Sequence, residues 1–187
     1  MVDQSVRADA ARNAERLVEA ARAALAETGL ELTTRELAQR AGVGLGTVHR
    51  RIPSMRTLLA RLLTESIDEM TRQAGQASEA PDAWSGFSDF AETYVHLRAT
   101  SCGLHEALAG QADLDLATPL DQLARAVQRL VSRAQRDGAI RTDIDWRDVR
   151  FVLASAISTD HTIGLTAAAD QSRRNLRIIL DGLRPRP

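Results

Sequence analysis

The fold of this chain is decided by residues 34–56, Thr34-Arg35-Glu36-Leu37-Ala38-Gln39-Arg40-Ala41-Gly42-Val43-Gly44-Leu45-Gly46-Thr47-Val48-His49-Arg50-Arg51-Ile52-Pro53-Ser54-Met55-Arg56. Two short helical patterns, one ending at Ala41 and one covering Leu45 to Arg51, flank a turn that contains two glycines. A helix, a short turn with glycine and a second short helix make up a helix-turn-helix, whose second helix enters the DNA major groove. The stretch therefore predicts a helix-turn-helix with its core at residues 33–52.

Helical spacing separates the inward side chains of this motif from the outward ones. Leu37, Ala38, Val43 and Val48 recur as its apolar positions and are expected to form a small core. Arg35 in the first turn can make a bidentate contact with guanine, and the hydroxyls and free N–H groups at the helix start suit a phosphate. The residues predicted to contact DNA are Thr33, Thr34, Arg35, Gly44, Leu45, Gly46, Thr47, His49, Arg50, Arg51 and Arg56.

The charge of the chain is distributed unevenly. All 24 basic residues are arginine, and the net charge of −1 combines a basic segment, residues 1–61, with an acidic remainder. Residues 35–61 hold six arginines and a single acid, Glu36. A local basic patch is typical of a nucleic-acid-binding surface, although a patch this small can also be a solvated face. The motif beside it favours the first interpretation.

The rest of the chain also reads as helical, and no convincing period-2 strand is found. Helices are expected at about residues 8–28, 34–41, 45–51, 54–77, 82–101, 103–111, 118–137, 145–160 and 171–183, with Thr33 or Thr34 and Asp145 as caps. The sequence predicts an all-α protein with a three-helix DNA-binding domain at residues 1–53 and a second helical domain at residues 54–187.

Composition restricts the function classes. No apolar run approaches the ~20 residues that span a bilayer, so no membrane association is expected. The N-terminus lacks the features of a signal peptide, and one cysteine, Cys102, cannot form an intrachain disulfide. A cytoplasmic location is therefore expected. No nucleophile elbow, phosphate loop or carboxylate dyad is found, so we expect that the chain is not an enzyme.

Residues 12–63 resemble the N-terminal domain of the tetracycline-repressor (TetR) family of transcription regulators. The matching residues are those of 32–43, Gly46-Thr47-Val48 and the restart Pro53-Ser54 with Leu58-Leu59. The resemblance implies a repressor that binds a palindromic operator as a homodimer and is released by a small molecule bound to its C-terminal domain. An alternative remains a helical adaptor that binds other proteins and has no sequence-specific affinity for DNA.

The sequence departs from the pattern of the family in three respects. His49 and Ile52 stand where the family usually has a tyrosine and a second aromatic residue, Gly44 stands where a capping serine is common, and Met55 replaces a phosphate-binding lysine. Arg51 or Arg56 can take over the phosphate contact of that lysine.

The C-terminal domain is expected to hold the effector, and an aromatic stripe supports this. The helix at 82–101 carries four of the six aromatic residues of the chain within residues 84–94. Such a stripe can be core, or it can form the wall of a pocket for an apolar or amphipathic compound. The predicted ligand-binding residues are Trp84, Phe87, Tyr94, Leu97, Cys102, His105, Leu108, Leu123, Val127, Leu153 and Ile157. No cofactor and no metal are expected, because His96, Cys102 and His105 lack the ligand number of a zinc site.

The last two helices are predicted to pair two subunits. Small residues at 154–156 and 158 permit close approach of helices, and the apolar area would come from Leu176, Ile179, Leu180 and Leu183. The alternative is that these residues pack inside one subunit.

Overall fold

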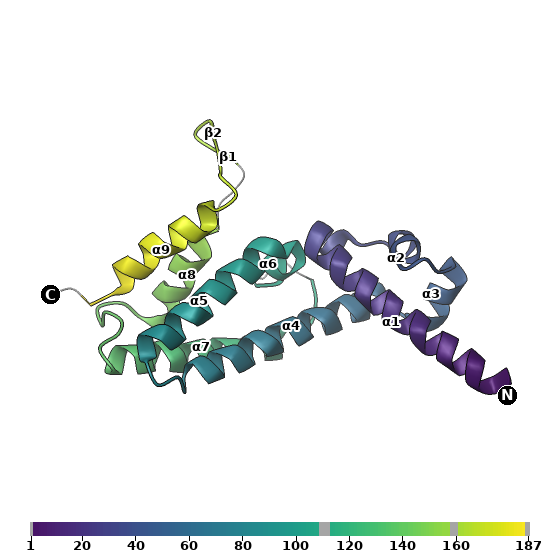
Figure 1. The fold of residues 1–187 in the computed structure, drawn as a ribbon, viewed down its shortest axis with the longest axis horizontal. Helices are drawn as coiled ribbons and strands as arrows, with labels where there is room; N and C mark the ends of the chain where they lie inside the picture. The colour runs from purple at the N-terminus through teal and green to yellow at the C-terminus, as the bar shows by residue number, and fades with distance from the viewer. Residues whose placement is uncertain (1, 109–112, 158–160, 186–187) are drawn as a thin grey trace. The chain divides into compact units, whose positions relative to one another are not determined.

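The structure, a computed structural model, describes residues 2–108, 113–157 and 161–185, and most of them are helical (Figure 1). The elements are α1 Val2–Thr28, η1 Gly29–Glu31, α2 Thr34–Ala41, α3 Leu45–Arg51, α4 Met55–Ala77, α5 Ala83–Thr100, α6 Cys102–Leu108, α7 Ala117–Arg136, α8 Trp146–Ser155, β1 His161–Thr162, β2 Leu165–Thr166 and α9 Gln171–Leu183. The all-α fold and the positions of its helices are confirmed.

The strands β1 and β2 correct the expectation that the chain contains no strand. They form an antiparallel hairpin in which His161 pairs with Thr166 and Thr162 pairs with Leu165. Strands of two residues are too short to produce a visible alternation of apolar and polar residues, so the pattern gave no signal. The helix expected at about 145–160 accordingly ends early, at Ser155.

Packing divides the chain into two compact units. The first consists of residues 1–65 and 100–116, and the second of residues 66–99 and 117–187. Helix α4 contributes residues to both units, and α6 belongs with the N-terminal helices although it follows α5 in the sequence. The domain boundary between residues 53 and 54 stays a prediction.

The first unit is built around the motif helices. Leu37 and Val48 are fully buried and Ala38 nearly so, whereas Val43 is half-buried, so the small core predicted from the spacing is confirmed apart from Val43. The core is completed by apolar residues of α1 and of the first half of α4: Leu17, Ala21, Ala24, Leu25, Leu58, Leu59, Leu62 and Leu63. This packing holds α3 with its polar side outward.

Within the first unit, α6 contacts both α1 and η1. A Cβ atom added to Gly103 would lie 2.2 Å from Cδ1 and 3.2 Å from the carbonyl oxygen of Leu25, so the two helices touch through the glycine. The backbone N–H of Leu30 donates to Oε2 of Glu106 at 3.3 Å. Only a residue without a side chain permits this approach, which explains the glycine inside a helix.

The second unit is a helical assembly that includes the amphipathic α7. The apolar stripe of α7 is buried as the sequence predicts, at Leu123, Val127, Leu130, Val131 and Ala134. Arg133 donates to the carbonyl oxygens of Ser78 and Ala80, which fixes the loop between α4 and α5. Gly86 in the first turn of α5 is buried, and a Cβ atom there would lie 2.5 Å from the carbonyl oxygen of Ala77.

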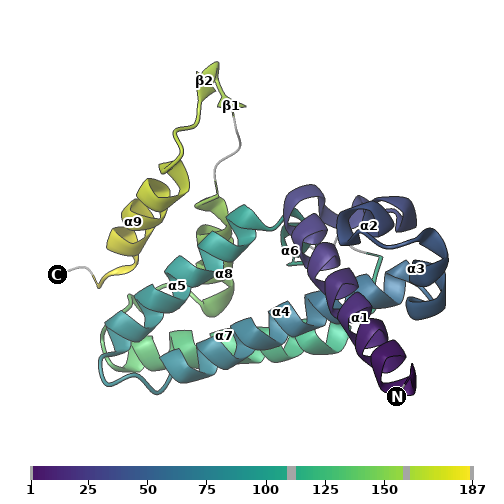
Figure 2. The same cartoon turned by 45° about the vertical axis from the view of Figure 1, so that its right-hand side comes forward.

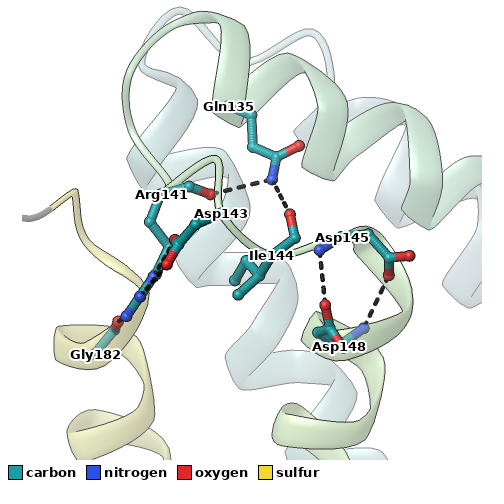
Figure 3. Close-up of polar contacts among 7 residues, drawn as sticks. All are labelled: Gln135, Arg141, Asp143, Ile144, Asp145, Asp148 and Gly182. Atoms are coloured by element: carbon teal, nitrogen blue, oxygen red, sulfur yellow. Dashed lines mark hydrogen bonds and ion pairs between the residues drawn. The ribbon is translucent and has the colours of Figure 1, made fainter.

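The link between α7 and α8 holds the last helices in place (Figure 3). Gln135 Nε2 donates to the carbonyl oxygens of Arg141 at 3.1 Å and Ile144 at 2.8 Å. The backbone N–H of Arg141 donates to the carbonyl oxygen of Leu183, and so ties this loop to the end of α9. Asp145 caps α8 and forms a capping box with Asp148, which confirms the predicted cap.

Candidate nucleic-acid interface

The first motif helix begins at a capping box. The Thr33 hydroxyl accepts from the backbone N–H of Glu36 at 3.2 Å, and the Glu36 carboxylate accepts from the backbone N–H of Thr33 at 2.8 Å. The Thr33 hydroxyl also donates to that carboxylate at 2.7 Å. These bonds to Thr33 hold the pKa of Glu36 below its usual range. They fix the start of α2, which positions Thr34 and Arg35 at the surface.

The turn between the motif helices depends on Gly42. Gly42 ends α2 with a φ of 62°, a left-handed conformation that glycine adopts without strain. Its N–H reaches the carbonyl oxygens of Ala38 and Gln39, and the N–H of Val43 donates to that of Ala38 at 3.0 Å. Nη2 of Arg16 on α1 lies 3.4 Å from the Gly42 carbonyl oxygen. The direction of the turn is therefore fixed by hydrogen bonds to the end of α2 and by the contact with Arg16 of α1.

Helix α3 presents a polar face to solvent. It follows Gly44, which has an extended backbone and no side chain to cap the helix. Its Val48 is buried, whereas Leu45, Gly46, His49, Arg50 and Arg51 are exposed. Of the eleven residues predicted to contact DNA, nine are exposed, and Thr34 and Thr47 are half-buried. All eleven belong to the first unit and none is sealed in its core.

The arginines of the motif fall into two groups. Arg40 pairs with Glu27 at 2.6 Å and Arg61 pairs with Glu65 at 3.0 Å. Within the described ranges, Arg35, Arg50 and Arg51 have no acidic group within ion-pair distance, and Arg50 Nη2 lies 3.3 Å from the Thr47 hydroxyl oxygen. Three full positive charges therefore stand at the ends of α2 and α3, available to phosphates.

Arg56, a further predicted DNA contact, is paired with an acid. Its Nη1 lies 2.8 Å from Oδ2 of Asp113 and its Nη2 lies 3.2 Å from Oδ1. The guanidinium group lowers the pKa of Asp113, and the carboxylate raises that of Arg56. No pattern in the sequence indicates this pair, because the two residues are 57 positions apart. A phosphate that contacts Arg56 has to compete with Asp113.

The predicted ligand-binding residues are divided between the units. Leu108, Cys102 and His105 belong to the first unit, and the side chains of the last two lie outside the described residues. In the second unit Phe87, Tyr94, Leu123, Val127 and Leu153 are buried, whereas Trp84, Leu97 and Ile157 are half-buried. The Phe87 ring stands 6.1 Å from that of Trp84, and the Phe90 ring 6.1 Å from that of Tyr94, so the four aromatic residues form two ring pairs. The ligand-binding assignment stays a prediction.

Most of the apolar residues predicted to pair two subunits are packed inside one subunit instead. Leu176, Leu180 and Leu183 of α9 are buried by their own chain, and so is Ala156 after α8, while Ile179 is half-buried. The periodicity of α9 correctly predicts one apolar face, but that face packs against the same chain and not against a second subunit. The exposed apolar residues of these helices are Phe151, Val152 and Ile178. Ser158 lies outside the described residues.

Among the described residues, no three His, Cys, Asp or Glu side chains are grouped so that they could hold a metal ion. None of the described helices is long and apolar enough to cross a membrane.

Two family models match the chain and together cover most of it. Residues 17–62 match the model of bacterial regulatory proteins of the tetR family, and residues 79–185 match the C-terminal domain of SbtR-like transcriptional regulators. A comparison with curated proteins found no match.

Solved structures of similar fold were also found. A TetR transcription regulatory protein from Mycobacterium vanbaalenii is 31% identical, with a TM-score of 0.62 over 96% of this chain and 99% of that chain. A TetR transcriptional regulator from Streptomyces coelicolor is 22% identical, with a TM-score of 0.67 over 93% and 99%. The transcriptional regulator FadR from Bacillus subtilis, in complex with stearoyl-CoA, is 18% identical, with a TM-score of 0.60 over 91% and 99%.

Proposed function

Because the chain belongs to the TetR family of transcription regulators, we propose that it is a homodimeric repressor, released from a palindromic operator by a small apolar or amphipathic molecule. The DNA-binding role follows from the family. The proposal adds three things to that role: the chain represses transcription, it acts as a homodimer, and its effector is apolar or amphipathic.

The main support for the proposed mode of DNA binding is the positive charge on the exposed side of the helix-turn-helix. Arg35, Arg50 and Arg51 have no acidic neighbour within ion-pair distance in the described chain, while Val48 anchors α3 from below. A helix so held presents its outer side chains to the major groove. We assign base reading to Arg35 and Thr47 and phosphate contacts to Arg50 and Arg51.

The homodimer is supported by the apolar side chains that α8 and α9 leave in solvent. Phe151 is 78% exposed and Ile178 is 71% exposed, and Val152 accompanies them. Large apolar side chains left in solvent on two neighbouring helices are what an interaction surface would use. A two-fold pair formed there presents two reading helices, which for a helix-turn-helix dimer contact half-sites ~34–36 Å apart or somewhat more. The operator is then an inverted repeat.

The effector class is supported by the second unit and by relatives of similar fold. The aromatic side chains of α5 pack in the apolar interior of the second unit, and a ligand with an apolar body would suit such surroundings. FadR from Bacillus subtilis was solved with stearoyl-CoA, an amphipathic molecule. Effector and operator are linked reciprocally: an effector that lowers operator affinity is itself bound more weakly by the DNA complex, typically by a factor of ~5–150.

The test starts with selection of preferred duplexes from a random pool, followed by fluorescence titration at two salt concentrations. We expect an inverted repeat, and affinity that falls steeply with salt. Arg50→Ala and Arg51→Ala should each weaken binding to every duplex and reduce the salt slope by ~0.9. Arg129→Ala, which removes an exposed arginine of α7, is the matched control and should change nothing.

Three outcomes would contradict the proposal. Affinity that is independent of salt would favour the protein-binding adaptor. A selected DNA sequence without two-fold symmetry would contradict the proposal that the chain binds DNA as a homodimer. Gel-shift screening of apolar compounds tests the effector: a bound compound that leaves operator affinity unchanged would contradict release by that class.

A further inference from the structure

The large apolar side chains that reach solvent are concentrated in one part of the chain. Six such residues are exposed among those described, and five of them lie between positions 151 and 178: Phe151, Val152, Ile163, Leu165 and Ile178. The sixth, Leu45, belongs to the DNA-reading helix. Helices α8 and α9 account for three of the five. The other two belong to the β1–β2 hairpin, which the proposed function does not use.

The turn of this hairpin has a backbone conformation that is unfavourable for its first residue. Ile163 and Gly164 connect the strands, with φ angles of 48° and 76°. Two-residue turns with both φ angles positive favour Asn and Gly, because a β-branched side chain clashes with its own backbone there. Ile163 is the only described residue other than glycine with a positive φ. The tip of the hairpin is therefore occupied by an isoleucine in a strained backbone conformation.

Nothing among the described residues of the same subunit compensates for this strain. Ile163 is 99% exposed and Leu165 is 68% exposed. In both views the hairpin extends away from α8 and α9 of its own unit (Figure 1, Figure 2). An isolated two-stranded hairpin is at best marginally stable in water. A strained, exposed hairpin with an apolar tip is therefore a structure that a partner would stabilise.

The chemistry of the segment indicates what kind of partner fits. Residues 161–169 contain no Asp, Glu, Lys or Arg. A segment without charge has no attraction to DNA phosphates or to acidic lipid headgroups, and its apolar tip fits an apolar protein surface. Both strands of a two-stranded sheet are edge strands, so their outer backbone donors and acceptors can pair with a further strand.

We propose that the β1–β2 hairpin is an arm that each subunit lays on a second copy of this chain. The hairpin lies in sequence between α8 and α9, the two helices whose exposed Phe151, Val152 and Ile178 form the proposed dimer surface. A two-fold interface uses each patch twice, so an arm next to the axis contributes two contacts to one dimer. This inference rests on the proposed homodimer and adds a second, separable set of contacts to it.

The experiment compares dimer dissociation constants of the full chain by analytical ultracentrifugation over a wide concentration range. The arm variant carries Ile163→Asp and Leu165→Asp. The matched control carries Gln122→Asp and Gln128→Asp, which introduce the same charges at exposed positions of α7. We expect the arm variant to dissociate at least tenfold more readily than the wild type, and the control to match the wild type. Helix content and the thermal midpoint of the monomer should be unchanged, because both hairpin side chains are in solvent in the subunit.

Hydrogen exchange of the hairpin amides supplies a second readout. The amides of 163–166 should be protected at concentrations above the dissociation constant and exchange freely below it. A wild-type dimer whose dissociation constant the arm variant leaves unchanged overturns the arm but leaves the homodimer intact. A wild-type chain that is monomeric at every concentration overturns the homodimer, and the arm with it. Protection that appears only with lipid vesicles assigns the hairpin to a membrane surface and also overturns the proposal.

Discussion

Replacing Gly103 with alanine is expected to loosen α6 from α1 and to destabilise the first unit. The added Cβ would lie 2.2 Å from Cδ1, 2.8 Å from Cγ and 3.2 Å from the carbonyl oxygen of Leu25. Leu25 is 5% exposed, so its side chain cannot turn away without disturbing a packed core. Either the leucine leaves its rotamer or the two helices separate.

The magnitude follows from two opposing terms. A methyl group forced into a packed site costs about 1–3 kcal/mol. Alanine in place of glycine inside a helix gains up to about 1 kcal/mol, because it reduces the freedom of the unfolded chain. Gly75 in α4 isolates the second term, since a Cβ atom there meets nothing within 4 Å. Gly103→Ala should therefore be less stable than Gly75→Ala by about 1–3 kcal/mol.

Thermal unfolding followed by circular dichroism measures this difference. For a chain of this size, about 2–4 °C of midpoint corresponds to 1 kcal/mol, so the two variants should differ by about 2–12 °C. Gly75→Ala should lie at or above the wild type. Equal midpoints for the two variants would refute the reasoning, because they would mean that α6 does not touch α1 through Gly103.

Three further predictions concern the DNA-reading unit. Arg35→Ala should cost about 1–3 kcal/mol of operator affinity and relax the preference at one base pair per half-site; equal weakening on all duplexes would make Arg35 a phosphate contact. Asp113→Asn should release Arg56 and steepen the salt dependence of DNA binding by about one counterion, as measured by titration at several salt concentrations, and an unchanged slope would show that Arg56 stays away from the phosphates. The pKa of Glu36 is lowered by its bonds to Thr33, so these bonds stabilise the fold at pH values above the ordinary pKa of 4.5. This stabilisation is lost as the pH falls through the lower pKa of the folded state. Urea unfolding from pH 7 to pH 3 should show a smaller loss for Glu36→Gln, and parallel curves would contradict this contribution.

The parts of the fold that depend on local signals could be predicted from the sequence. The cap at Thr33, the left-handed Gly42 and the buried Val48 each follow from residues within one or two turns of one another. The same holds for α7, whose apolar stripe is long and regular enough to fix one buried face. Local propensity and periodicity agree at these places, so the sequence alone was sufficient.

The parts that depend on contacts between distant residues could not be predicted. Asp113 carries no pattern that points to Arg56, and nothing in the sequence places α6 beside α1 rather than beside α5. The apolar face of α9 illustrates the same limit. Periodicity identifies Leu176, Leu180 and Leu183 as one face, but it cannot tell whether the same chain or a second copy covers it.

The division into two units restricts how an effector can act on the reading helix. The chain passes between the units three times, inside α4, at the junction of α5 and α6, and before α7. Two of the segments that connect the units are helices held inside the first unit, α6 through Gly103 and Glu106, and α4 through its buried leucines and Arg56. The third connection, just before α7, follows Asp113, which pairs with Arg56 of α4, so we expect a displacement of this segment to act on α4 as well. We therefore expect a signal from the second unit to reach α3 through α6 or through α4, and the variants Gly103→Ala and Asp113→Asn to weaken these two routes separately. If effector release requires α6, it fails in the first variant and survives in the second, whereas the reverse result would assign the coupling to α4.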